Sequence, residues 1–183
     1  MKNLWQPFTL SALALSGTGI FSGVAAEAVQ LADGRIVFDR PPNLVEATTL
    51  DYAAGFEGTY HFVIEVPDNA GEALGAIVVT PRDHARDVVF NLDASEAQLS
   101  TAYANGPRVE LSSVGGRAEN PDEVLVVFDD PVQPGETVTV SLETDYNPRG
   151  GVYLFGVTAY PAGDNSVGQF LGYGRIHIFD ADN

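Results

Sequence analysis

Three histidines are the side chains best suited to acid–base or metal chemistry near neutral pH: His61, His84 and His177. His61 and His177 fall in stretches of alternating polar and apolar residues, which are typical of β-strands, whereas His84 lies in the charged segment 82–87. A metal pair would require His61 and His177 to be neighbours across a sheet, and the sequence does not establish that pairing. We therefore expect each histidine to have a structural role.

Neither the serines nor the carboxylates indicate hydrolytic chemistry. The sequence has no G-x-S-x-G motif, which holds the nucleophile of α/β-hydrolases. The adjacent residues Asp129 and Asp130 cannot act as a pair in glycoside hydrolysis, because neighbours on a strand point to opposite faces. We predict that the protein is not an enzyme. An enzyme acting on envelope polysaccharide is the most distant alternative, and it would need carboxylates from two strands to converge in a cleft.

Acidic turns make calcium the better chemical hypothesis, since Ca²⁺ takes several oxygen ligands, often from loops. The candidate ligands are Asp68 and Glu72 in one turn, with Asp129 and Asp130 beside a predicted strand. None has the D-x-[DN]-x-[DN]-G spacing of an EF-hand loop, and turns favour aspartate and asparagine for backbone reasons alone. The alternative function is therefore a calcium-binding sandwich whose stability or assembly depends on calcium. Apart from calcium we expect no cofactor.

The composition is strongly acidic. The 183 residues include 25 acidic and nine basic side chains, giving a formal net charge of −16. Nucleic acid and anionic membrane surfaces would repel such a protein, so we expect neither as a partner. The chain has no cysteine, which excludes disulfides and thiolate chemistry.

The first 26 residues have the features of a secretory signal peptide. Lys2 precedes an apolar run that ends in the small residues Val24-Ala25-Ala26, and we place cleavage after Ala26. An uncleaved membrane anchor is the alternative, but glycines and serines interrupt the run. Residues 27–183 then form a single domain in the periplasm, the outer envelope or the extracellular space. No later stretch is apolar for long enough to span a bilayer.

Short alternating segments between turn residues indicate an all-β protein. In the strand expected over 136–144, Val138, Val140 and Leu142 should point inward and the hydroxyls toward water. One short helix is expected over 93–103. We predict an immunoglobulin-like antiparallel β-sandwich of eight or nine strands, with a small β-barrel as the alternative. Ten segments are candidates for these strands, at residues 35–38, 47–52, 60–66, 74–80, 88–92, 108–114, 123–128, 136–144, 152–160 and 170–179.

The strand expected over 152–160 is apolar on both faces, so both must be covered. Either the protein covers the second face itself, or Tyr153, Phe155, Tyr173 and Arg175 form an exposed aromatic patch that contacts a partner. The second case predicts a non-catalytic structural or binding module of the cell envelope. Its partner would be an envelope protein or a polysaccharide.

Three segments resemble an exported cyanobacterial family known as a domain of unknown function. They are PGETVTVSL at 134–142, NPRGGVYLFGVTAYPAG at 147–163 and GYGRIHIF at 172–179. The resemblance covers most of residues 27–183. It implies a periplasmic or cell-envelope location, and it brings no catalytic residues.

Overall fold

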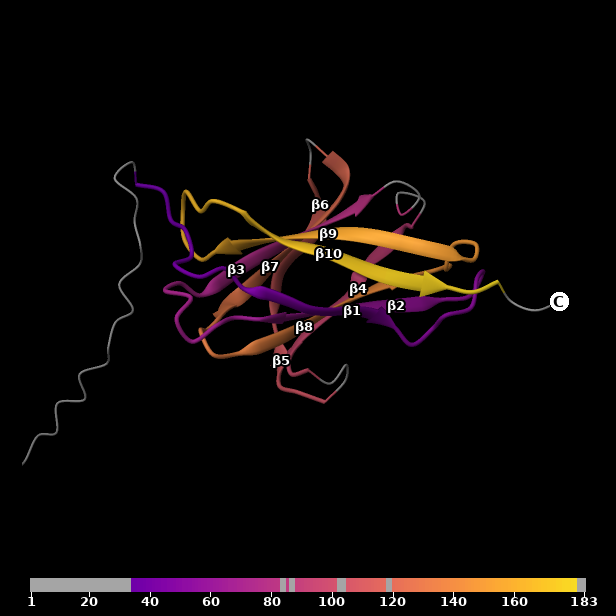
Figure 1. The fold of residues 1–183 in the computed structure, drawn as a ribbon, viewed down its shortest axis with the longest axis horizontal. Coiled ribbons are helices and arrows are strands. Elements are labelled where there is room, and N and C mark those ends of the chain that lie inside the picture. The colour runs from indigo at the N-terminus through magenta and orange to yellow at the C-terminus, as the bar shows by residue number, and fades with distance from the viewer. Residues whose placement is uncertain (1–33, 83–84, 86–87, 102–104, 118–119, 181–183) are drawn as a thin grey trace, which may run out of the picture.

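The computed structural model describes residues 34–180, except 83, 84, 86, 87, 102–104, 118 and 119. In this part of the chain, ten strands form two five-stranded sheets that face each other (Figure 1). The predicted signal peptide, His84 and the end of the predicted helix at Tyr103 lie outside the described residues.

The predicted antiparallel β-sandwich is confirmed, and the two sheets do not close into a barrel. The first sheet has the order β1 (Asn43–Thr49), β2 (Gly58–Glu65), β8 (Thr137–Thr144), β4 (Phe90–Leu99) and β5 (Arg108–Val109). The second has the order β10 (Gln169–Ile178), β9 (Gly151–Pro161), β3 (Leu74–Arg82), β7 (Asn120–Val132) and β6 (Leu111–Arg117). The described part of the chain thus has ten strands rather than eight or nine.

The strand order is that of a constant-type immunoglobulin sandwich with an insertion. In that fold, strands A, B, E and D form one sheet and strands C, F and G the other. Here β1, β2, β8 and β4 take the places of A, B, E and D, while β3, β9 and β10 take those of C, F and G. The strands β5, β6 and β7 are inserted between D and E. They extend the two sheets at one edge.

Aromatic rings fill the centre of the core, where antibody domains have a disulfide between strands B and F. Phe155 on β9 makes edge-on contacts with Tyr60 and Phe62 on β2, at ring-centroid distances of 5.7 and 5.9 Å. The Tyr153 hydroxyl donates a hydrogen bond of 2.6 Å to the Arg149 carbonyl, as in the tyrosine corner of immunoglobulin domains. That tyrosine stands two residues before the second cysteine, which is the position of Phe155 here.

The helix predicted over 93–103 is wrong: this segment belongs to β4 as far as Leu99. Residues 96–99 pair with the central strand β8, and Ala97 is buried against the core. The prediction failed because Ala94 and residues 96–99 favour a helix locally, whereas pairing with β8 decides the conformation. The strand expected over 35–38 is reduced to one bridge between Ile36 and Ser166.

The Thr139 and Ser141 hydroxyls of β8 are buried, contrary to the prediction that the hydroxyls of this strand face water. Thr139 is fully buried and donates a hydrogen bond of 2.5 Å to the Ser100 carbonyl. Ser141 lies 2.9 Å from Nδ1 of His61 on the neighbouring strand. Since β8 lies between β2 and β4 in the middle of its sheet, side chains of both neighbours shield its outer face.

Candidate functional site

The face of β9 that carries Tyr153 and Phe155 is covered by the opposite sheet of the protein itself. Tyr153 and Phe155 point into the core, where they are 5% and 0% exposed. The predicted patch of Tyr153, Phe155, Tyr173 and Arg175 is therefore wrong in its composition, because the first two residues face the opposite sheet. Tyr173 and Arg175 are exposed on the other side of the second sheet.

The outer side of this sheet has its own row of apolar side chains. Strand pairing places Tyr173 of β10 opposite Gly156 of β9, and Thr158 of β9 between Phe170 and Val78. The Phe170 and Tyr173 rings lie 5.1 Å apart in an edge-on arrangement, and both are 54% exposed. A Cβ on Gly156 would lie 3.3 Å from Phe170 and 3.6 Å from Tyr173, so the two rings pack over bare backbone.

A β-bulge brings these two rings to one face. Residues 170 and 173 are an odd number of positions apart, so in a regular strand they would point to opposite faces. The pairing of β10 with β9 shifts between Phe170 and Gly172, and Gly172 has a φ of 135°, which favours glycine. A regular alternating pattern therefore does not place Phe170 on the same face as Tyr173. The neighbouring glycines were the available indication.

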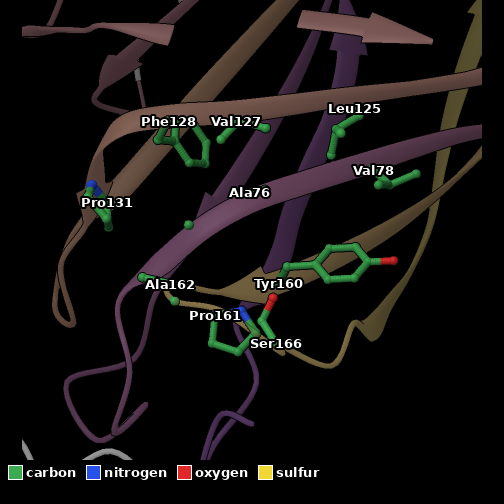
Figure 2. Close-up of a pocket in the computed structure, with 12 residues that line it drawn as sticks. Ala76, Val78, Leu125, Val127, Phe128, Pro131, Tyr160, Pro161, Ala162 and Ser166 are labelled. Atoms are coloured by element: carbon green, nitrogen blue, oxygen red, sulfur yellow. The ribbon is translucent and has the colours of Figure 1, made fainter. Parts of the chain in front are cut away.

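An apolar groove of about 410 Å³ lies on the same side of the sheet, across β9, β3 and β7. Val78 in its lining pairs with Thr158, which pairs with Phe170. Figure 2 shows the Tyr160 ring beside β3, with Leu125, Val127 and Phe128 of β7 across from it. Among the described residues that line the groove, Tyr160 and Ser166 supply the side-chain hydroxyls. The lining consists of Gly75, Ala76, Val78, Leu125, Val127, Phe128, Pro131, Tyr160, Pro161, Ala162, Gly163 and Ser166.

We call the groove together with Phe170 and Tyr173 the outer apolar face. Arg82 is at its far end, with its guanidinium carbon 5.8 Å from the centre of the Tyr173 ring. Arg175 lies on the same side of the sheet, opposite Leu154. Exposed apolar surface of this kind is typical of a site that another molecule covers.

The predicted calcium ligands do not come together. Asp68 follows β2, whereas Asp129 and Asp130 lie exposed on β7. Burial, and after it the charge of Asp39, raises the pKa of the Glu72 carboxyl. Among the described residues, no three His, Asp or Glu side chains are placed to hold a metal ion.

The histidines also lie apart, since His61 is on β2 of the first sheet and His177 on β10 of the second. His61 is 7% exposed. Burial lowers the pKa of the His61 imidazole, against the smaller opposing effects of Asp51 and Glu46. The arrangement suits a buried neutral histidine bonded to Ser141.

Carboxylates from different elements do meet in one hollow of about 640 Å³ at an end of the sandwich: Asp51, Glu57, Glu143 and Asp145 line it. Asp51, Glu57 and Asp145 are exposed to solvent. A glycosidase holds its acid in a water-poor environment that raises the carboxyl pKa, and this hollow does not provide one.

Within the described ranges, the structure has no helix long and apolar enough to cross a membrane. A comparison with curated proteins finds no match.

Several solved structures of bacterial surface proteins are similar at low sequence identity. The major pilin subunit BcpA of Bacillus cereus gives a TM-score of 0.48 at 11% identity, over 76% of this chain and 41% of the pilin. The collagen-binding subdomain of Enterococcus faecalis ACE gives 0.44 at 6% identity, over 76% and 98%. The bacterial hydrophobin BslA gives 0.43 at 15% identity, over 77% and 100%. The chain thus spans about two fifths of the pilin's length, and scores below 0.5 establish no shared function.

A family model covers almost all of the described sandwich. Its match runs from residue 35, just before the bridge at Ile36, to residue 178, the last residue of β10. The chain belongs to the family described as protein of unknown function (DUF2808).

Proposed function

We propose that the protein is a non-catalytic, exported module of the cell envelope, of cyanobacterial origin, that binds a partner protein through the outer apolar face. The observation that carries the proposal is that the exposed rings of Phe170 and Tyr173 and the apolar groove over β9, β3 and β7 lie on the same side of the second sheet. A domain with a separate, filled core gains nothing from such a surface unless a partner covers it.

The lining favours a protein partner over a polysaccharide. A sugar needs several hydrogen-bonding groups beside an aromatic ring, because each buried hydroxyl that loses water must be satisfied. Aliphatic and proline side chains dominate the groove, with the Tyr160 and Ser166 hydroxyls as its polar side chains among the described residues. Apolar side chains of a protein segment match this surface better.

The experiment compares envelope retention of the native chain with that of a Phe170→Ser/Tyr173→Ser double variant in the source cells. Both rings are half exposed, so their removal should leave the folded domain intact while retention falls. The matched control is Val45→Ser/Val89→Ser, which removes two exposed apolar side chains elsewhere. Thermal unfolding of the purified proteins verifies that all three fold. Equal retention of the two double variants would refute the proposal.

A further inference from the structure

A second exposed apolar surface lies at one end of the sandwich, on the right of Figure 1, where β10 ends. It is formed by the loop between β1 and β2, the turn after β8 and the residue after β10. Its large apolar side chains are between 46% and 72% exposed: Leu50, Tyr52, Phe56, Tyr146 and Phe179. This surface is separate from the outer apolar face, and none of these five residues lines the groove described above.

The backbone beneath these side chains is held by hydrogen bonds rather than left as an open loop. The buried Asn147 accepts from the Gly55 amide through its carbonyl and donates its own amide to the Phe56 carbonyl, at 2.9 and 2.7 Å. Its side-chain amide donates to the carbonyls of Asp51 and Ala53, at 2.7 and 3.1 Å. These hydrogen bonds hold the backbone that carries the exposed rings in one conformation, which lowers the entropic cost of binding.

The residue after β10 adds two further hydrogen bonds to this backbone. Phe179 donates its amide to the Tyr52 carbonyl at 2.7 Å and accepts from the Ala54 amide at 2.9 Å. The Tyr52 and Phe179 rings then meet edge-on, with centroids 6.3 Å apart. Exposed rings fixed in this way are typical of the aromatic anchors of binding sites.

Carboxylates surround these rings. Two hollows of about 640 and 460 Å³ adjoin each other and share Asp51, Phe56 and Glu57 in their linings. A third hollow, lined by residues 146–153 and Asp180, shares Tyr146 with the first and Asp180 with the second. Of the described residues that line the three hollows, Arg149 is the one basic side chain. The acidic side chains in the same linings are Asp51, Glu57, Glu143, Asp145 and Asp180.

Three of these five carboxylates have no ion-pair partner among the residues that the structure describes. Asp51 accepts a hydrogen bond from the Thr59 amide, and Asp180 accepts one from the Gly150 amide. Glu57, Glu143 and Asp145 form no ion pair with the part of the chain that the structure describes. We call the five apolar side chains and the five carboxylates the acidic–aromatic tip.

We propose that the acidic–aromatic tip is a docking site for a lysine- or arginine-rich segment of a protein partner. The charge selects a cation, and aromatic rings attract ammonium and guanidinium groups through their faces as well as by apolar contact with the side-chain stems. The same charge repels anionic lipid and nucleic acid, which leaves a basic polypeptide as the occupant. The proposal does not depend on the function of the outer apolar face.

The experiment measures binding of a fluorescein-labelled eight-residue peptide of alternating lysine and leucine by fluorescence polarisation. The same peptide with glutamate in place of lysine should not bind, and added salt should weaken the complex. In the protein, we expect Phe56→Ser/Phe179→Ser to weaken binding at least about tenfold, as anchor residues do. Glu57→Lys/Asp145→Lys should have an effect of similar size.

Two matched variants separate a defined site from general attraction by an acidic protein. Asp129→Lys/Asp130→Lys changes the net charge by the same amount on exposed positions of β7. Phe170→Ser/Tyr173→Ser removes two exposed rings from the outer apolar face. Less than about threefold weakening in both supports the proposal. Weakening by the β7 charge variant equal to that of the tip variants would overturn it, as would binding of the glutamate peptide or no binding of the lysine peptide to the native protein.

Discussion

At the scale of single residues, buried polar side chains have taken structural roles. His61 and Ser141 bond to each other on the outer side of the first sheet, in positions that the neighbouring strands shield. The pattern of residue types predicted that His61 lies on a strand. It could not predict the burial, because that depends on which strands become its neighbours.

The lowered pKa of His61 makes stability depend on pH. Because the folded state binds the proton less well than the unfolded state, the stabilisation is complete above about pH 6.5 and is lost as the pH falls toward the lower, folded value. We expect the free energy of unfolding of the native chain to fall between pH 7.5 and 5.5 more steeply than that of His61→Gln. Urea titrations at several pH values measure this difference.

The exposed His177 provides the matched control, because His177→Gln removes an imidazole from the surface rather than from the buried pair with Ser141. Glu72 contributes with the opposite sign, since its raised pKa costs stability as the pH rises through it, but this cancels in the comparison. Parallel pH curves for the native chain and His61→Gln would contradict the prediction.

At the scale of elements, local irregularities decide which side chains share a face. The bulge at Gly172 turns Phe170 and Tyr173 to the same side of β10, and the shift in pairing between Asn91 and Glu96 lets β4 continue along β8. An alternating pattern assumes a regular strand, so it cannot show such shifts.

Replacing Gly172 by alanine tests the bulge. Nothing lies within 4 Å of the added Cβ, so the cost comes from a φ of 135° that alanine adopts poorly, and we expect a loss of about 1–3 kcal/mol in the free energy of unfolding. Gly115→Ala on the edge strand β6 is the control, with equally open surroundings and no such φ. Urea unfolding of both variants measures the difference. Equal stabilities would show that the Gly172 backbone carries no strain.

At the scale of the whole molecule, the negative charge is spread over many turns. The formal net charge of the chain is −16, so we expect divalent cations to act chiefly by screening it. Calcium and magnesium at matched ionic strength should then raise the thermal midpoint of residues 27–183 by equal, small amounts relative to EDTA. A clearly larger rise with calcium would identify a specific site that stabilises the native state by mass action.

The sequence by itself determined the all-β class, most strand positions and the sandwich, because alternation and turn residues act locally along the chain. It also showed that β9 is apolar on both faces. Only the tertiary structure decided which face enters the core, where Phe155 meets Tyr60 and Phe62, which lie 95 and 93 positions earlier in the chain. The tertiary structure likewise brought Tyr52 to Phe179 and Phe170 to Tyr173, since the first contact joins the two ends of the domain and the second requires a bulge.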